Sequence, residues 1–387
     1  MVSGILRSAL LGLFVFSLVA CSNADFESPR NFRNFSQNLE SLSASRELKF
    51  AKSSPTKGRA KIFLIAGSEE NANFAQEIVE QRLYWLDQGY TADDIACFYA
   101  LPSDYSYQED RAQFSVLRPH LADCQHANPK DIFEAIHESG KMGHDFLYLY
   151  ATSHGSPPFT ELLKEKDLSF GTRAFLDGFV RSYPELADQY MLTVDGSPSG
   201  RTASLMALAA EYKRGAKPEE VFFTPRYLKA ALSSWPAEVQ KYIVLQACHS
   251  GGFVQDPRTE FQKDLLSSIP NLVAMTASRY DRSSFGCDSG SHRTFFGGAF
   301  NDTLLRSEEN PDEIRWPQFY RSIKRQVEKL EKLREVETAS LPDFIDTRGR
   351  GSQIKEESPL NEGGVDVGPS SGNELDENKV GESAEAK

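Results

Sequence analysis

The sequence has few of the residues that metal sites and disulfide-stapled proteins need. Its five cysteines in 387 residues do not make a disulfide framework, although Cys97 and Cys124 could pair in an oxidising compartment. The seven histidines are spread along the chain, and neither a His-Glu-x-x-His nor a Cys-x-x-Cys spacing occurs. The sequence therefore argues against a zinc enzyme.

Positive charge is also scarce. The chain has 43 Lys and Arg against 55 Asp and Glu, a net charge of −12, and no basic patch stands out. Binding to phosphates needs such a patch, so we predict no nucleic-acid partner. A serine-hydrolase elbow of the Gly-x-Ser-x-Gly type is missing around Ser250, because Cys248 stands two residues before it.

The apolar run near the N-terminus, residues 9–16, is too short to span a membrane. We read residues 1–20 as a signal peptide. Its end, Leu18-Val19-Ala20-Cys21, resembles a bacterial lipobox, which implies that Cys21 becomes the lipidated first residue and anchors the protein to a membrane. Ser22 in the next position favours the outer membrane, facing the periplasm. The alternative is an ordinary secretory signal, and both interpretations predict export to the cell envelope.

Composition divides the remaining chain into three parts. Residues 21–60 are rich in Ser, Asn and Arg and are expected to be a tether. Residues 61–340 have the apolar content of one folded domain. From residue 351 onward nine acidic residues stand against three lysines, with no aromatic residue, a composition that cannot bury a core. We therefore expect residues 341–387 to be an acidic disordered tail.

Apolar runs typical of strands alternate with segments of helical periodicity within the domain. Strands are predicted at residues 61–67, 95–101, 145–152, 241–247 and 271–278, and helices at 73–86, 131–139, 175–180, 204–212, 225–235, 294–305 and 316–336. This alternation predicts a parallel sheet covered by helices on both faces. The insertion at about residues 156–240 is longer than a crossover needs, so we expect a lid or a wall of a cleft.

Two of the predicted strands end in side chains that can do chemistry. One runs into Cys248 and a glycine turn, and another runs into His154 and Gly155. If the two strands are neighbours in a parallel sheet, His154 and Cys248 emerge at the same edge, where open α/β sheets bind their ligands. An imidazole there can take the proton of the thiol. The backbone N–H groups of Gly155 and Cys248 are candidate donors to an oxyanion.

Two simpler interpretations compete with this assignment. A cysteine at the end of a buried strand is more often a small core residue than a nucleophile, and only its pairing with a His-Gly strand end argues for catalysis. His249 and His292 are rival bases. Because neighbours along an extended chain point in different directions, we expect His249 to face away from the sulfur of Cys248.

Four motifs in order resemble those of the legumain-like, C13-type cysteine peptidases of the caspase-like clan. They are Ile65-Ala66-Gly67-Ser68, His154-Gly155, Ala247-Cys248-His249-Ser250-Gly251, and Thr276-Ala277-Ser278 with Ser283-Ser284-Phe285-Gly286-Cys287. Gln246-Ala247-Cys248 also resembles the nucleophile signature of caspases. Between Cys248 and the next glycine this sequence has two residues, His249 and Ser250, where that signature has one. The resemblance covers about two thirds of the chain.

The resemblance implies a caspase-like three-layer α/β sandwich with a mostly parallel central sheet. It also implies a cysteine endopeptidase that hydrolyses peptide bonds of a protein or peptide substrate through a Cys248–His154 dyad and a thioester, without a cofactor. An asparagine that orients the base in that family corresponds to Asn73. The alternative role for Asn73 is a helix N-cap, which asparagine fills readily.

The substrate pocket departs from the family pattern. Legumains bind an Asn side chain with an Arg-His pair, a Glu two residues before the nucleophile, a Ser pair and an Asp. Only the Ser pair is kept, as Ser283 and Ser284; the other positions hold Ala75-Gln76, Gln246 and Gly298. We therefore expect Gln246 and the Ser pair to line a pocket that is closer to neutral, without a strict preference for Asn or Asp.

Two other functions are compatible with the same motifs. An amine that attacks the thioester would make the protein a transamidase, like the glycolipid-anchor transamidase that shares these motifs. A catalytically inactive binding module at the envelope is the second alternative. Product analysis with an added amine separates the first from a peptidase, and a thiol-directed probe of the active site separates the second.

Overall fold

The computed structural model describes residues 59–67, 72–100, 111–194, 212–287, 291–307 and 314–348. The predicted signal peptide, the predicted lipidation site Cys21, all but the last two residues of the predicted tether and nearly all of the predicted acidic tail lie outside these residues. So do Ser68 and all but the last residue of the helix candidate at 204–212. No helix in the described part is long and apolar enough to cross a membrane.

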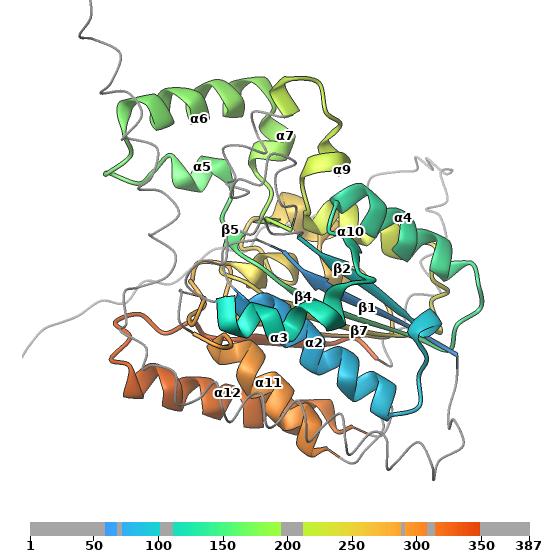
Figure 1. Ribbon diagram of the computed structural model, residues 1–387. Helices are drawn as coiled ribbons and strands as arrows, with labels where there is room; N and C mark the ends of the chain where they lie inside the picture. Colours follow the sequence, from blue (N-terminus) through green and yellow to red (C-terminus); the bar gives the residue numbers. More distant parts are fainter. Residues whose placement is uncertain are drawn as a thin grey trace, which may run out of the picture. The chain divides into compact units, whose positions relative to one another are not determined.

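A sheet of seven strands in the order β3-β2-β1-β4-β7-β8-β9 forms the centre of the fold (Figure 1). The strands are β1 (Ala60–Ala66), β2 (Ile95–Tyr99), β3 (Gln125–His126), β4 (Phe146–Thr152), β7 (Gln240–Gln246), β8 (Leu272–Thr276) and β9 (Asp343–Asp346). All neighbouring pairs are parallel except β8 and β9. The predicted α/β architecture with a mostly parallel central sheet is confirmed.

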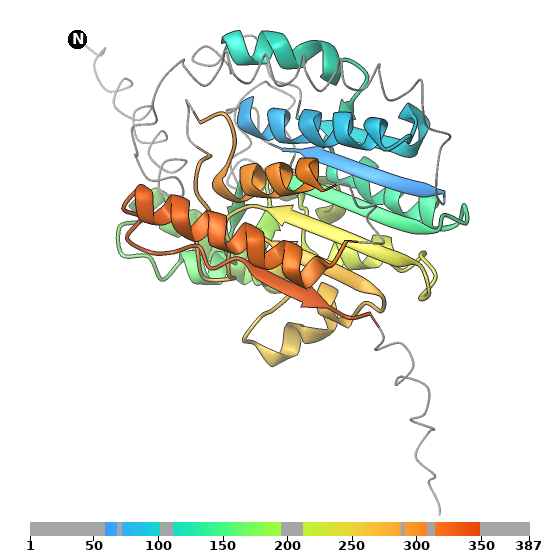
Figure 2. The same ribbon diagram turned by 90° about the horizontal axis from the view of Figure 1, so that it is seen from below.

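Helices cover both faces of the sheet. One face carries α2 (Ala72–Asp87), α3 (Arg111–Leu121), α11 (Phe295–Arg306) and α12 (Trp316–Leu333), which Figure 2 shows together. The other carries α4 (Pro129–Gly140) and α10 (Pro225–Leu232). Short 3-10 turns η1 (Ala92–Asp94), η2 (Ser250–Phe253), η3 (Thr259–Asp264) and η4 (Leu266–Ser268) complete the connections.

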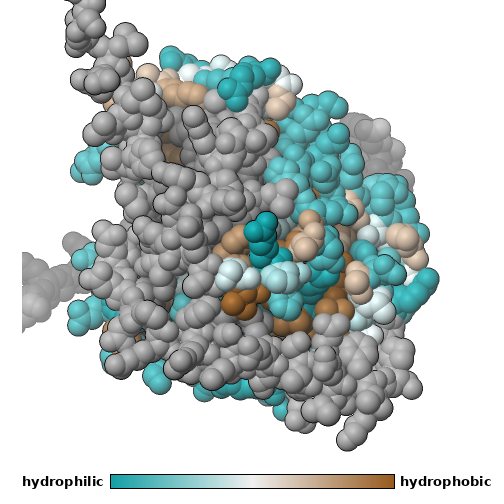
Figure 3. Space-filling view, in the orientation of Figure 1, coloured by the Kyte–Doolittle hydropathy of each residue, from teal (hydrophilic) through white to brown (hydrophobic). Residues whose placement is uncertain are grey.

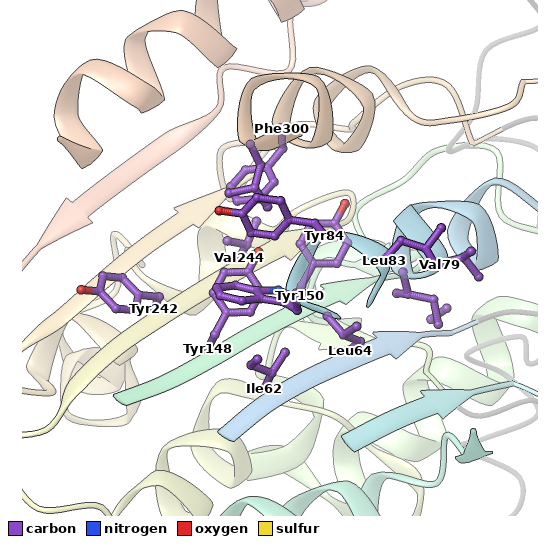
Figure 4. Packing of buried hydrophobic residues seen from close by; sticks show 14 of the residues in the cluster. Ile62, Leu64, Val79, Leu83, Tyr84, Tyr148, Tyr150, Tyr242, Val244 and Phe300 are labelled. Carbon is purple, nitrogen blue, oxygen red and sulfur yellow. The ribbon is translucent and has the colours of Figure 1, made fainter. Parts of the chain in front are cut away.

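Alternation along each strand divides the core between the two faces. In β4, Tyr148 and Tyr150 belong to the cluster under α2 and α11, whereas Leu147 and Leu149 belong to the cluster under α4 and α10. Figure 4 shows the first set, with Tyr150 near Phe300 of α11; their ring centroids lie 5.7 Å apart. Side chains at even positions of β4 therefore project toward α2 and α11.

Helix α4 begins close to the residue that the sequence predicts. Asn128 caps the helix by accepting a hydrogen bond from the Lys130 N–H, and Pro129 occupies the first helical position. Ile132 and Ile136 are buried against the sheet, while Figure 3 shows mostly hydrophilic residues over the outer side of this helix.

The predicted insertion contains its own small core. It includes β5 (Gly155–Ser156), α5 (Phe159–Leu162), α6 (Phe170–Ser182), α7 (Pro184–Ala187), β6 (Met191–Leu192) and α9 (Pro218–Val221). Eight of its residues form a separate buried cluster that includes Phe159, Phe179 and Phe222. The antiparallel pairing of β5 with β6 begins at Gly155, directly after His154, so the insertion starts at the strand end of interest.

Helix α3 and strand β9 are among the elements that were not predicted from the sequence. Helix α3 contains Pro119 and polar residues, and Phe114, Val116, Leu117 and Leu121 are its residues in or against the core. Strand β9 lies beyond residue 340, where the sequence analysis ends the domain, and it has only four residues. The β9 strand is recognisable only through its partners, because pairing with β8 and the stack of Phe344 on Tyr320 at 5.1 Å hold it in place.

A disulfide joins Cys97 of β2 to Cys124, which precedes β3. Replacing both residues by serine should lower the free energy of unfolding by about 3 kcal/mol, because the bond closes a loop of 27 residues and removes entropy from the unfolded chain. Urea denaturation of the variant and of the wild-type protein, each with and without reductant, measures this. An unchanged midpoint in the variant would show that the bond contributes nothing to stability.

Candidate active site

The ends of β4 and β7 lie side by side. Thr152 and Gln246 are the last paired residues of the two parallel strands, and the Ser153 N–H donates to the Gln246 carbonyl at 3.0 Å beyond them. His154 and Cys248 each lie two residues further on, so both chains leave the sheet at the same edge. The adjacency of the two strands, which the sequence analysis assumed, is confirmed.

Cys248 is a thiol that belongs to no disulfide, and only 2% of its surface is exposed. The Ser284 N–H donates to its sulfur at 3.3 Å, and the Ser284 hydroxyl oxygen lies 3.7 Å from the same atom. Burial raises the pKa of the Cys248 thiol, and hydrogen bonds from Ser284 and Ser283 oppose that rise. The thiol is therefore protonated at neutral pH, and an attack by its sulfur requires a base.

Gly155 lies in close contact with the backbone of Cys248. A Cβ atom at this position would overlap the carbonyl oxygen of Cys248 and lie 3.0 Å from the Cβ of Ala247. Only glycine lets the chain after His154 pass this close to the chain of Cys248. The requirement for Gly155 is thus steric, and it keeps the two strand ends in contact.

The ring of His154 packs edge-on against Phe74 of α2, with ring centroids 5.3 Å apart and planes at 85°. Its carbonyl accepts a hydrogen bond from the Thr193 N–H at 3.0 Å. The imidazole is therefore held by a helix over the sheet, and its backbone by the segment after β6. The sulfur of Cys248 contacts Ser284, in the loop that Asn73 of α2 also bonds.

The two rival histidines face other partners. His249 has φ 57°, and its Nδ1 lies 2.9 Å from the carbonyl oxygen of Tyr280. That contact directs the His249 ring toward the loop after β8. Burial lowers the pKa of His249. Nδ1 of His292 lies 3.2 Å from the side-chain oxygen of Gln113 in α3.

Asn73 is the second residue of α2, so it is not the N-cap. Its side-chain amide donates to the carbonyl oxygen of Gly286 at 2.8 Å. This bond ties α2 to the loop that holds the Ser pair, 213 residues further along the chain. Orientation of the base by Asn73 stays a prediction.

The predicted pocket positions each have neighbours of their own. Gln246 is completely buried, and its amide oxygen lies 3.2 Å from the hydroxyl of Thr152. The amide of Gln76 donates to Glu80 at 3.1 Å. A Cβ atom at Gly298 would lie 3.5 Å from Nε of Arg293, so a cation stands beside the position that holds an Asp in legumains.

Arg293 forms ion pairs with two carboxylates. It bonds Asp302 at 2.7 Å and Glu80 at 3.4 Å. Glu80 raises the pKa of Arg293 strongly, so this side chain stays charged. Its charge is therefore balanced within the domain.

Sequence reasoning missed the contacts that attach the insertion to the nucleophile turn. A Cβ atom at Gly252 would overlap the ring of Tyr190, which precedes β6. Arg258, on the chain after the turn, bonds Asp256 at 2.7 Å and Asp188 of the insertion at 3.2 Å. The Gly251-Gly252 pair was the only sequence signal for such close packing.

Comparison with known proteins identifies the second half of the domain. Residues 216–345 match the model of the peptidase C13 family, a stretch that includes Cys248, Ser283 and Ser284. Over this stretch the chain is similar to the peptidase C13 family. His154 and Asn73 precede the matched stretch. No curated protein matches the chain.

Two solved structures are similar to this chain. Protein GSU0716 from Geobacter sulfurreducens has 10% sequence identity and a TM-score of 0.40, with 75% of this chain and 94% of that chain covered. Caspase-1 from Spodoptera frugiperda has 11% identity and a TM-score of 0.37, with 77% and 94% covered.

The close approach at Gly155 can be tested against a matched glycine. Gly155→Ala should lower the stability by about 1 to 3 kcal/mol through overpacking and change the rate at which iodoacetamide labels Cys248, because the strand ends must move apart. Gly171→Ala in α6 is the control: no atom lies within 4 Å of its Cβ position, so stability should stay equal or rise slightly. Melting temperatures and peptide mapping of the label measure both effects. Equal melting temperatures and equal labelling rates in the two variants would contradict the close contact at Gly155.

Proposed function

We propose that this protein is a cysteine endopeptidase in which Cys248 is the nucleophile and His154 the general base. The observation that carries the proposal is the adjacency of the ends of β4 and β7, which brings the two residues to one edge of the sheet. The match to the C13 peptidase family over the Cys248 strand supports a cysteine-peptidase type of activity.

The first chemical step follows from the protonated state of the buried thiol. As the sulfur of Cys248 attacks the peptide carbonyl carbon, His154 accepts the thiol proton, and the carbonyl oxygen takes the negative charge. The backbone N–H groups of Gly155 and Cys248 are the proposed donors to that oxyanion. Collapse breaks the C–N bond, and the imidazolium returns its proton to the leaving amine, which leaves a thioester.

Hydrolysis of the thioester repeats these roles with water. His154 accepts a proton as water attacks, and the sulfur leaves as a thiolate that is reprotonated. The Ser284 N–H, 3.3 Å from the sulfur, supports both steps, because a hydrogen bond to a charged sulfur is stronger than one to a thiol. Ser284 thus stabilises the leaving thiolate.

The dyad predicts a loss of turnover in two variants and its retention in a third. Cys248→Ala and His154→Ala should each lower kcat by about 10⁴-fold, because residues that act as a unit are not additive. His249→Asn should keep most activity, since Asn tolerates the positive φ at this position and the His249 ring faces Tyr280. Digestion of a peptide library by the purified chain and its variants, with circular dichroism to check folding, measures this. Wild-type turnover by Cys248→Ala would refute the proposal.

The altered pocket predicts relaxed specificity before the cleaved bond. A site built to bond one polar side chain discriminates by about 10⁴-fold or more, but Gln246 replaces the charged residue on which legumains rely. Rates for identical peptides with Asn, Asp, Ala, Leu or Arg at that position should therefore differ by less than about a hundredfold. An Asn preference above this limit would show that the pocket is assigned to the wrong residues.

A further inference from the structure

A buried carboxylate lies beneath the strand ends and has no place in the mechanism above. Glu77 of α2 is completely buried. Its two oxygens accept four hydrogen bonds, from Tyr150 at 2.8 Å, from Thr152 at 2.7 Å, and from both the N–H and the hydroxyl of Thr294 at 2.7 Å. One carboxylate therefore joins α2, β4 and the N-terminus of α11.

These four bonds explain how a carboxylate is kept in an otherwise apolar layer. Burial raises the pKa of Glu77, and the bonds from Thr152, Thr294 and Tyr150 oppose that rise. Because buried hydrogen-bonded networks are costly to break, each member is held in one position. Residue 297 has to be glycine, since a Cβ atom at this position would overlap the Glu77 carboxylate.

Thr152 differs from the other partners because it touches a second strand. Its hydroxyl lies 2.7 Å from Glu77 and 3.2 Å from the amide of Gln246 in β7. Thr152 stands two residues before His154, and Gln246 stands two residues before Cys248. Among the described residues, the Thr152 hydroxyl thus makes a side-chain contact between the two strands directly below the proposed dyad, beside the backbone bonds of the sheet.

We propose that Thr152 is a positioning residue: its hydroxyl couples the buried Glu77 carboxylate to Gln246 and so fixes the spacing of the strand ends that carry His154 and Cys248. This inference rests on the proposed function of the dyad. Tyr150 provides a matched comparison, because its hydroxyl binds the same oxygen of Glu77 from the same face of β4 but, within the described residues, makes no hydrogen bond to a side chain of β7.

The test compares Thr152→Val, Thr152→Ser and Tyr150→Phe. Thr152→Val keeps the shape and removes the hydroxyl, and it should lower kcat by about 10- to 100-fold with little change in KM, as expected for a misplaced reacting group. Thr152→Ser keeps the hydroxyl and should restore most of the rate. Tyr150→Phe removes one bond to Glu77 and should lower the melting temperature with little effect on kcat.

A second readout does not depend on peptidase activity. The pH profile of Cys248 alkylation by iodoacetamide, followed by mass spectrometry of the Cys248 peptide, should be displaced in Thr152→Val and unchanged in Thr152→Ser and Tyr150→Phe. If Tyr150→Phe loses as much kcat as Thr152→Val and its alkylation profile is displaced as far, the proposal is overturned. The network around Glu77 would then stabilise the fold in general, without a special role for Thr152. A wild-type alkylation profile in Thr152→Val would also overturn the proposal.

The same panel separates this inference from the proposed function. If the wild-type chain and Cys248→Ala turn over peptides equally, the peptidase assignment fails, whereas the alkylation profiles still decide whether Thr152 positions the thiol. If the peptidase assignment holds and Thr152→Val has wild-type kcat, only the positioning role fails.

Discussion

Parallel pairing of β4 with β7 is the constraint on which the rest of the candidate site depends. The register runs from Phe146 opposite Gln240 to Thr152 opposite Gln246, so the two chains leave the sheet level with each other. A shift by one residue would turn either His154 or Cys248 to the other face. The apolar side chains below, buried on both faces, hold that register.

The carboxyl edge of the sheet combines this apolar support with buried polar groups. On the face under α2, the Tyr148 hydroxyl donates to Gln81, and the next positions are Tyr150, Thr152 and Gln246, whose polar atoms meet Glu77 or one another. Buried hydrogen bonds to α2 therefore run along β4 up to the edge at which the thiol lies. Each of these hydroxyl groups has a partner, so they are kept within the core without opening it to water.

Close backbone contacts set the shape of the same edge. Gly155 lies against the carbonyl of Cys248, Gly251 against the backbone of Tyr280, and Gly252 against the ring of Tyr190. Each contact joins a different element to the nucleophile turn: the start of the insertion, the loop after β8, and the segment before β6. The turn is consequently held from three sides, and its glycines are explained by their neighbours rather than by the turn alone.

Much of this arrangement could be predicted from the sequence. The strands β1, β4, β7 and β8 are continuous apolar runs, and α2, α11 and α12 have helical periodicity, so their limits were predicted to within a few residues. A parallel sheet brings strand ends to one edge by its geometry, so the sequence predicts that the strands before His154 and Cys248 end at the same edge. A local rule also sufficed for the Asn128 cap of α4. The direction of His249 was expected from an extended chain, but a left-handed turn and the contact with Tyr280 set it.

Only the tertiary structure decided the contacts between distant segments. Strand β9 has four residues and is recognisable only through β8, and the bond from Asn73 to Gly286 spans 213 residues. Likewise, nothing near Glu77 in the sequence indicates that Thr152, 75 residues away, shares its carboxylate. Hydrophobic periodicity reports which face of an element is buried, because burial repeats with the element's own period. Which polar groups meet is set by the packing of complete elements, and no local pattern records that.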